Sequence, residues 1–324
     1  MTIALTGSTA FDYLMKFPGY FKDHILPEHL EKISLSFLVD DMVKQRGGVA
    51  ANIAYNLAML GAKPLLISNA GQDFSEYRQA LEAMGIDTSG VEISKEKFTA
   101  SFFANTDLSN AQIASFYAGA MAEAANVSLL TKGLTSQDMV VISPNDPLAM
   151  VKYCHECAQM GVPFIFDPGQ QIIRMSKEDL VFGVTHAYAL FVNDYEFQLL
   201  IKHTGLSESE LYSYPRFTVI TLGAQGSVIH MQNGQTSEIP VVKPMRIKDP
   251  TGVGDAFRGG FLRGYLENFD LGICGRMGSL AAAYCLEQSG TQNHFYTRQE
   301  FVNRYHEIFQ DDVFLEAIIS KINN

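Results

Sequence analysis

The sequence predicts an α/β protein whose core is a mostly parallel β-sheet covered by helices. Short apolar runs alternate with longer helical stretches along most of the 324 residues. A strand, a helix and a second strand in succession form a right-handed βαβ unit, which places its strands parallel. Residues 31–46 and 98–117 break this alternation and predict a small additional sheet.

The predicted core strands are short, apolar and closed by a turn-forming or polar residue. They are Ile3–Thr6, Leu65–Ser68, Met139–Ile142, Pro163–Phe166, Ala189–Val192 and Thr218–Thr221. The helical stretches between them include Val49–Leu60, Phe74–Met84, Pro147–Met160 and Glu178–Phe182.

The two exceptional stretches have the pattern of exposed β-structure. Residues 31–46 alternate partly, like a half-exposed strand. Phe98–Asn105 and Gln112–Tyr117 flank a polar turn, Thr106–Asn110, and predict a hairpin. We therefore expect a small β lid formed by residues 13–46 and 98–117. The remaining residues, 1–12, 47–97 and 118–324, are expected to form the α/β core.

Charge and composition exclude several classes of partner. The chain has 24 basic and 35 acidic residues, a net charge of −11, which argues against binding to nucleic acid or an anionic membrane. We see no signal peptide and no run of about 18 apolar residues that would span a membrane. Four cysteines in so long a chain fit a reducing cytosol. We expect a cytoplasmic protein with a small-molecule partner.

The most informative motif is the segment Asp249–Phe257. Pro250 fixes a turn, and Gly252 and Gly254 free the backbone just before a helical run, Ala256–Leu266. Free N–H groups and the dipole at a helix N-terminus form an anion site. A carboxylate there, Asp255, suits a general base that deprotonates a hydroxyl attacking a phosphoryl group. The alternative is a strand-to-helix turn with an ordinary aspartate cap.

Polar residues near the first strand and the first helix are candidates for substrate binding. Gly47 and Gly48 lead into an alanine-rich helix on which Asn52 and Asn56 share one face. Asn52 either binds substrate hydroxyls or is a satisfied core amide. Asp12 follows the first strand, where the carboxyl ends of strands line a ligand crevice. It either accepts two sugar hydroxyls or is a surface turn residue.

Two further segments suit a nucleotide, and one resembles a metal motif. The oxygens of Asn193 and Glu196 follow a strand and suit phosphate contacts and hydrated Mg²⁺. In the segment Thr221–Gly226, glycines allow the backbone to approach a flat ligand or to turn sharply. Cys154 and Cys157 lack a second pair of ligands, so we interpret them as packing residues instead of a zinc site.

In their order along the chain, the motifs resemble the ribokinase-like (PfkB) family of carbohydrate and nucleoside kinases, from about residue 3 to about residue 308. That order is the glycine pair with Asn52, then Asn193–Glu196, then Thr221–Gly226 and then Asp249–Asp255. The resemblance implies a doubly wound α/β fold with a small β lid and ATP-dependent phosphorylation of a primary hydroxyl. It implies that Asp255 is the base, and that the backbone of Gly252, Val253 and Gly254 is the anion hole. It also assigns Asp12, Gly48 and Asn52 to the sugar, Asn193, Thr221, Gly223 and Gly226 to ATP, and Glu196 to Mg²⁺.

Within that family the chain resembles bacterial and archaeal adenosine or nucleoside kinases. The segments are Gly254–Arg258, Ser143–Pro147, Asp167–Gln171 and Gly290–Gln292. The resemblance implies transfer from ATP to the 5′-hydroxyl of a ribonucleoside, adenosine first among them, giving AMP and ADP. A monovalent cation such as K⁺ is a further candidate cofactor, and the chain is expected to be a monomer or a homodimer.

Several alternatives remain open at this stage. A sugar kinase acting on ribose or fructose has the same fold, and a catalytically silent nucleotide-binding regulator is a third reading, against which the intact Asp255 argues. The roles of Arg258, Gln170 and Gln171 are not assigned, although the absence of charge on the two glutamines disfavours an anionic substrate. The lid aromatics either stack on a purine or pack the lid onto the core. They are Phe37, Phe102, Phe103, Phe116 and Tyr117.

Overall fold

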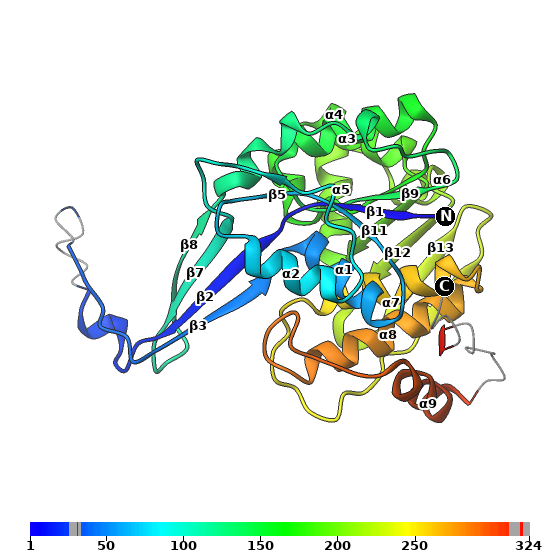
Figure 1. The fold of residues 1–324 in the computed structure, drawn as a ribbon. Helices are drawn as coiled ribbons and strands as arrows, with labels where there is room; N and C mark the ends of the chain where they lie inside the picture. Colours follow the sequence, from blue (N-terminus) through cyan, green and yellow to red (C-terminus); the bar gives the residue numbers. More distant parts are fainter. Residues whose placement is uncertain (26–30, 32–33, 311–317, 320–324) are drawn as a thin grey trace.

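A central β-sheet runs through the body of the molecule, and helices flank it (Figure 1). The computed structural model describes residues 1–25, 31, 34–310 and 318–319, and among these the strands form three sheets. The largest has eight strands. In spatial order they are β14 (Thr236–Ile239), β13 (Ser227–Met231), β12 (Phe217–Thr221), β11 (Ala189–Asn193), β10 (Phe164–Phe166), β9 (Met139–Ile142), β1 (Ile3–Thr6) and β4 (Leu65–Ile67).

The strand directions confirm the predicted parallel sheet. All the pairs from β12 to β4 are parallel, whereas β13 and β14 add an antiparallel edge that the sequence pattern did not predict. Strands β1 and β9 are buried at every position, as expected where helices cover both faces of a sheet.

Helices pack on both faces of the sheet and create two apolar cores (Figure 1). One face carries α3 (Pro147–Met160), α4 (Lys177–His186), α5 (Asp194–Thr204) and α6 (Glu208–Ser213). The other carries α1 (Val49–Met59), α2 (Ser75–Ala83), α7 (Val253–Leu266), α8 (Leu271–Leu286) and α9 (Arg298–Phe309). The predicted doubly wound α/β architecture is therefore confirmed.

The order of the strands reverses between β1 and β9. From β1 the chain crosses to β4 on one side, and it later returns to β9 on the other side of β1. In an open α/β sheet the ligand crevice lies at such a reversal, beyond the carboxyl ends of the strands. Here the loops after the two strands are joined, because the Ser8 N–H donates to the Pro144 carbonyl over 3.0 Å.

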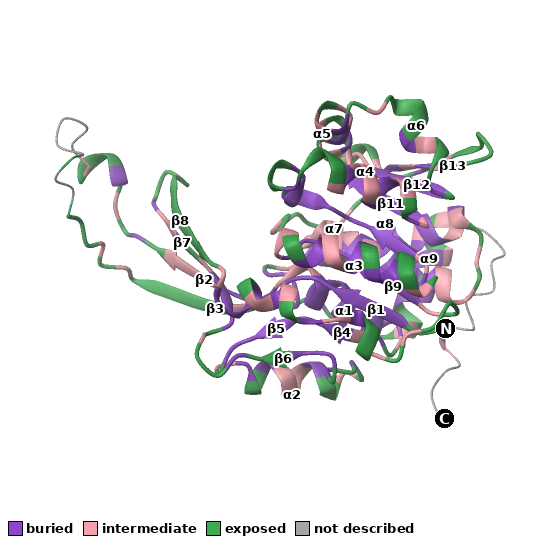
Figure 2. Ribbon diagram, turned by 90° about the horizontal axis from the view of Figure 1, so that it is seen from above, coloured by how far each residue is buried: buried purple, intermediate pink, exposed green. Residues whose placement is uncertain are grey.

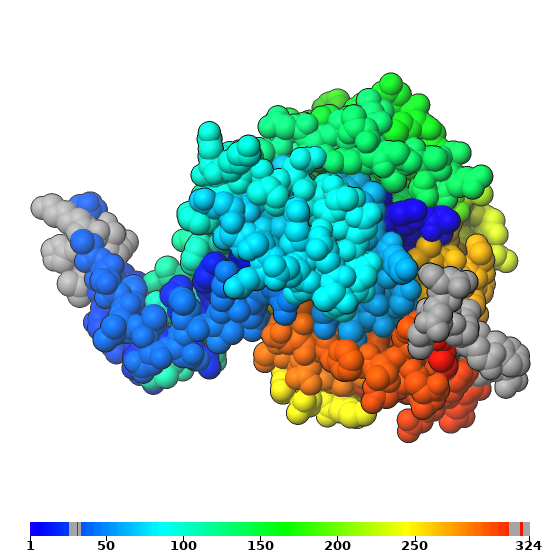
Figure 3. All heavy atoms as spheres, viewed as in Figure 1, coloured from blue at the N-terminus to red at the C-terminus, as the bar shows by residue number. Residues whose placement is uncertain are grey.

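A second, four-stranded sheet projects from the body of the molecule (Figure 1). Its order is β3 (Asp41–Gly47), β2 (Ala10–Lys16), β7 (Ala100–Thr106) and β8 (Gln112–Tyr117), and we call it the lid sheet. The predicted 98–117 hairpin is the antiparallel pair β7–β8. Many of its residues are exposed (Figure 2), and the space-filling view shows the sheet standing off the body (Figure 3).

Two details of the lid sheet differ from the prediction. The strand expected over 31–46 begins only at Asp41, because its partner β2 ends at Lys16 and Pro18 has no N–H to continue the ladder. Residues 26–30 and 32–33 of the expected lid lie outside the described residues. Strand β2 begins at Ala10, so Asp12, which was assigned to the core with residues 1–12, lies in a strand of the lid sheet.

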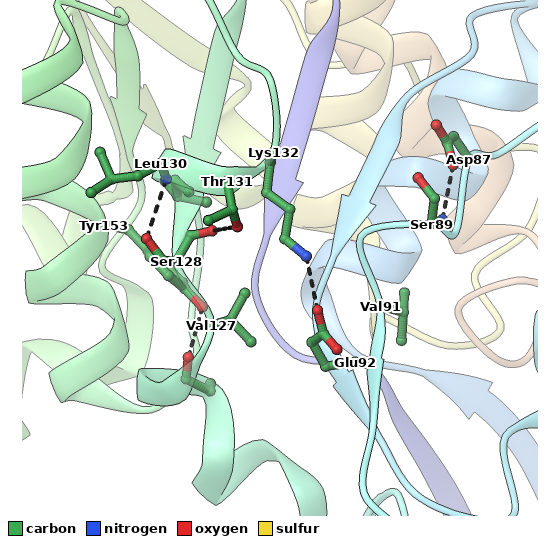
Figure 4. A network of polar contacts seen from close by, with 12 residues as sticks. Asp87, Ser89, Val91, Glu92, Val127, Ser128, Leu130, Thr131, Lys132 and Tyr153 are labelled. Carbon is green, nitrogen blue, oxygen red and sulfur yellow. Dashed lines mark hydrogen bonds and ion pairs between the residues drawn. The ribbon is translucent and has the colours of Figure 1, made fainter.

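The segment that follows the lid hairpin is fastened to the core (Figure 4). The third sheet pairs β5 (Asn69–Ala70) with β6 (Glu92–Ile93). The ammonium group of Lys132 lies 2.9 Å from Oε1 of Glu92 on β6, and the Tyr153 hydroxyl donates to the Ala124 carbonyl. The chain that leaves β8 is therefore tied to both the small sheet and α3.

The cysteines pack in the core, as the sequence suggested. Cys154 and Cys157 are buried in the cluster between α3 and the sheet, and all four thiols are free. Among the described residues no group of three or more His, Cys, Asp or Glu side chains is placed to hold a metal. In the same part of the chain, no helix has the length and apolar character needed to cross a bilayer.

Candidate active site

Two adjoining cavities lie at the reversal of the strand order. The larger has a volume of 480 Å³ and the smaller a volume of 190 Å³. Val49, Pro144, Gln170 and Asp255 line both of them. A carboxylate therefore stands where the two spaces meet, and a group bound in either cavity can reach it.

The larger cavity brings together the three residues that the sequence suggested for substrate binding. Asp12 comes from β2, Gly48 from the start of α1 and Asn52 from the first turn of α1. Gly48 has φ +96°, and a Cβ there would lie 2.6 Å from the Ser8 carbonyl oxygen. Only glycine lets the lid sheet and α1 meet at this angle.

Asp12 faces the cavity in an environment that disfavours its charge. Burial, together with the nearby Asp249 carboxylate, raises the pKa of Asp12 from 3.8 to about 6. Gly47 on the neighbouring strand leaves room for this carboxylate: a Cβ at Gly47 would lie 2.7 Å from Asp12 Oδ2. Hydroxyl donors from a ligand would satisfy this carboxylate and stabilise its ionised form.

The rest of the larger cavity has an apolar wall and a polar floor. Phe116, Met121 and Ile173 form the wall, while Gln171 and Arg174 add donors and acceptors. Among the described lid aromatics only Phe116 lines the cavity. Two of the others pack within the lid: Phe103 stacks on Tyr13 with ring centroids 4.8 Å apart, and Phe37 packs against Phe17 and Phe21.

The N-terminus of α7 points into the meeting point of the two cavities. Gly252 is its N-cap with φ +77°, and no side chain caps the helix, so the cap interpretation of Asp255 is wrong. The first turn of any helix has N–H groups without intrahelical partners. Gly252 lines the larger cavity and Gly254 the smaller, which places this first turn between the two spaces.

One hydrogen bond orients the Asp255 carboxylate, and burial sets its pKa. The side-chain amide of Asn52 donates to Asp255 Oδ2 over 2.8 Å. Burial raises the pKa of Asp255 from 3.8 to about 6, an effect that Arg258 and the Asn52 hydrogen bond partly oppose. A carboxylate with such a pKa is ionised at neutral pH and remains basic enough to accept a proton.

A buried ion pair beside Asp255 was not predicted from the sequence. Arg258, one turn further along α7, donates from Nη2 to Asp167 Oδ1 over 2.6 Å, and its Nε faces the second oxygen. Asp167 follows β10 and is 1% exposed. The signal was present in the sequence, because Arg258 interrupts an apolar helix face and Asp167 ends an apolar strand. It did not show that the two residues are partners.

The smaller cavity holds most of the residues suggested for a nucleotide. Asn193, Glu196 and Thr221 line it. Asn193 and Glu196 form a capping box at the start of α5: Asn193 Oδ1 accepts from the Glu196 N–H, and Glu196 Oε2 accepts from the Asn193 N–H. The two side chains thus orient each other at the cavity wall.

The glycines of the β12–β13 turn lie outside the lining of the two cavities. Gly223 and Gly226 are not among the described residues that line either cavity. Gly226 has φ +90°, and a Cβ there would overlap the Ile239 carbonyl oxygen at 2.2 Å. The turn therefore requires this glycine for the close approach of β14, whatever it contributes to a ligand.

Comparisons with known proteins show the family of this chain. A model of the pfkB family of carbohydrate kinases matches residues 19–298. A nucleoside kinase from Methanocaldococcus jannaschii is 32% identical over 304 residues, covering 93% of this chain and 96% of that protein. The solved structure of the ligand-free nucleoside kinase of Burkholderia thailandensis is 37% identical with a TM-score of 0.85, covering 94% of this chain and all of that one (100%).

A second structure of the Burkholderia thailandensis enzyme, in complex with inosine, is also similar to this chain. It is 36% identical with a TM-score of 0.82, and covers 96% of this chain and 99% of that one. The family match spans most of the chain, and it confirms the resemblance seen in the motifs. This chain belongs to the pfkB family of carbohydrate kinases.

Proposed function

We propose that this protein is an ATP-dependent nucleoside kinase that phosphorylates the 5′-hydroxyl of a ribonucleoside, with adenosine as its favoured substrate. The observation that carries the proposal is the position of Asp255 in the wall shared by two cavities. One cavity suits a sugar with an attached base and the other suits a polyphosphate. The similar nucleoside kinases support the same substrate class.

The larger cavity is the proposed nucleoside site. Asp12, on the lid sheet, and Asn52, on α1, present groups that bind sugar hydroxyls. The apolar wall of Phe116, Met121 and Ile173 favours a nucleoside over a free sugar, because a sugar has no flat apolar part to cover such a wall. The neutral donors and acceptors at Gln170 and Gln171 suit the edge of a purine.

The smaller cavity and the start of α7 are the proposed phosphate site. The backbone N–H groups of Gly252, Val253 and Gly254 and the dipole of α7 would bind the transferring phosphoryl group. Asn193 and Thr221 would contact the phosphates of ATP. Gly223 and Gly226 remain candidates for the nucleotide through the shape of their turn.

Magnesium fits this donor set in one way. Glu196 and its neighbours supply hard oxygens, which Mg²⁺ prefers, but the described residues form no metal cage of their own. We therefore propose that the ion arrives on ATP and that Glu196 holds it through its water shell. Bound there, Mg²⁺ neutralises charge on the phosphates. A requirement for K⁺ stays a prediction, and so does the choice between monomer and homodimer.

In the proposed mechanism Asp255 acts as the general base. Its carboxylate takes the proton from the 5′-hydroxyl as the oxygen attacks the γ-phosphorus, and ADP leaves from the smaller cavity. Asn52 keeps Oδ2 engaged, so Oδ1 is the oxygen that receives the proton. Arg258, paired with Asp167, compensates the negative charges of Asp255 and Glu196.

Closure of the lid completes the proposal. Residues 13–46 and 98–117, with the start of β2, would fold over the nucleoside and exclude water that competes for the phosphoryl group. Gly47 ends β3 and Gly48 caps α1, so the two glycines join the lid sheet to α1 and would form the hinge. The projecting position of the sheet in this structure supports an open form (Figure 1).

The decisive experiment measures ADP release across a panel of nucleosides and sugars. Nucleoside-dependent ADP release with adenosine as the best acceptor, abolished in Asp255→Asn, is the expected result. Turnover with ribose or fructose and not with nucleosides would identify a sugar kinase. ATP binding without turnover on any acceptor would identify a silent regulator. Substitution of Na⁺ for K⁺ in the same assay tests the cation.

A further inference from the structure

A hydrogen-bonded chain connects the hinge of the lid sheet to Asp255. Its first member is the backbone carbonyl of Gly47, at the end of β3, which accepts from the Tyr77 hydroxyl over 2.9 Å. The amide nitrogen of Gln292 contacts both the Tyr77 oxygen and the Asn52 side-chain oxygen. Asn52 then donates to Asp255.

The Gly47 carbonyl determines which group donates and which accepts in every hydrogen bond of this series. A carbonyl oxygen only accepts hydrogen bonds, so the Tyr77 hydroxyl donates its single hydrogen to Gly47. The same hydroxyl can then only accept from Gln292. The group of Gln292 that faces Tyr77 is therefore Nε2, and its second hydrogen meets Oδ1 of Asn52 over 2.9 Å. Asn52 is left with Nδ2 toward Asp255, as observed.

The side chains of this hydrogen-bonded series are shielded from water. Tyr77, Asn52 and Gln292 are 1%, 3% and 7% exposed. A buried amide cannot exchange its donor and acceptor ends without leaving polar groups unpaired, which makes the arrangement specific. These residues come from α2, α1 and the segment before α9, so only the tertiary fold assembles them.

We propose that Gln292 and Tyr77 are positioning residues for phosphoryl transfer: anchored on the hinge carbonyl of Gly47, they hold the Asn52 amide so that it donates to Asp255. This inference rests on the proposed function, because it assigns Asp255 as the base. Movement of β3 on closure of the lid displaces the Gly47 carbonyl, so the lid and the base are coupled. Neither Gln292 nor Tyr77 lines either cavity among the described residues.

Two substitutions at Gln292 separate this role from simple packing. Gln292→Met keeps the length of the side chain but removes the hydrogen bonds, so the Asn52 amide loses its support. Gln292→Glu keeps the shape, but an ionised carboxylate only accepts and forces Asn52 to turn its oxygen toward Asp255. We expect kcat to fall about tenfold in the first variant and further in the second.

The acid limb of the kcat/KM profile is the readout that a packing defect would not move. It should shift upward by about one to two pH units in Gln292→Glu, the equivalent of one lost hydrogen bond to a charged group, and by less in Gln292→Met. The charged groups that face Asp255 are Arg258 of α7, Asp167 after β10 and Glu196 of α5. They are unchanged in every variant, as is the Cys285 thiol of α8.

Tyr77→Phe tests the other end of the chain with the loss of one oxygen atom. It should lower kcat severalfold and leave the KM for ATP nearly unchanged. In the double variant with Gln292→Met the two effects should not add, because both break one chain. Tyr55→Phe is the matched control, since it removes a buried hydroxyl that donates only to the His294 carbonyl. Asn293→Asp controls for a new charge beside Gln292.

The outcomes separate this inference from the proposed function. If Asp255→Asn keeps normal turnover, the assignment of the base is wrong. If Asp255→Asn is inactive while Gln292→Glu and Tyr77→Phe retain the wild-type pH profile, the positioning role alone is refuted. Additive losses in the double variant, or equal losses in Tyr55→Phe, would also overturn it. Thermal unfolding of each variant verifies that it is folded.

Discussion

Replacement of Asp255 by Asn should inactivate the enzyme and stabilise it at the same time. As the proposed base, Asp255 supplies a proton acceptor whose removal typically lowers the rate by about 10²–10⁴-fold. Its charge also destabilises the folded state, as shown by the pKa of this buried carboxyl, which is raised from 3.8 to about 6. Asparagine has nearly the same shape and can still accept from the Asn52 amide, but it carries no charge.

The size and the pH dependence of the stabilisation follow from that pKa. One pKa unit corresponds to about 1.4 kcal/mol, so the ionised form destabilises the fold by about 3 kcal/mol at most, an upper limit because the carboxylate faces open cavities. A raised carboxyl pKa means that the folded state holds its proton longer than the unfolded chain. The stability of the wild type therefore falls as the pH rises from 3.8 to about 6.

The measurement compares thermal unfolding of wild type and Asp255→Asn across this range. The variant should melt up to about 6 °C higher at pH 8 and within about 1 °C of the wild type near pH 4. ATP and nucleoside binding, measured by calorimetry, should persist. A variant that melts lower than the wild type at pH 8, or that retains turnover, would refute the assignment of Asp255 as a buried catalytic base.

Four further outcomes are expected. Asp12→Ala should raise the nucleoside KM roughly 5- to 150-fold and leave the ATP KM nearly unchanged, because it leaves ligand hydroxyls unpaired; equal effects on both substrates would make Asp12 structural. Arg258→Met should destabilise the fold by about 3–5 kcal/mol, since it leaves Asp167 buried without its partner, and the added Asp167→Asn should recover most of that loss; denaturant unfolding measures both. Nucleoside should slow hydrogen exchange in the described parts of 13–46 and 98–117, and protection confined to the core would refute the lid. Gly48→Val should reduce transfer to nucleoside while ATP still binds, because a Cβ there meets the Ser8 carbonyl.

The sequence by itself determined much of the local structure. Apolar runs such as Ile3–Thr6 and Met139–Ile142 are strands with the predicted bounds, because a strand covered on both faces is apolar at nearly every position. The glycines at 252 and 254 and the carboxylate at 255 indicated a helix N-terminus, and α7 begins there; the binding of an anion stays a prediction. That inference needs only residues close together in the chain, and backbone geometry decides it.

Only the tertiary structure decided which distant residues become partners. Asp12 was assigned to the core with residues 1–12 and lies in a strand of the lid sheet, because pairing with β3 and β7 extends the chain there. Arg258 meets Asp167 and Gln292 meets Asn52 across 91 and 240 positions of sequence. No local pattern encodes such pairs. They form because a buried polar group must find a partner, and the packing of α1, α7 and the sheet determines which partner is within reach.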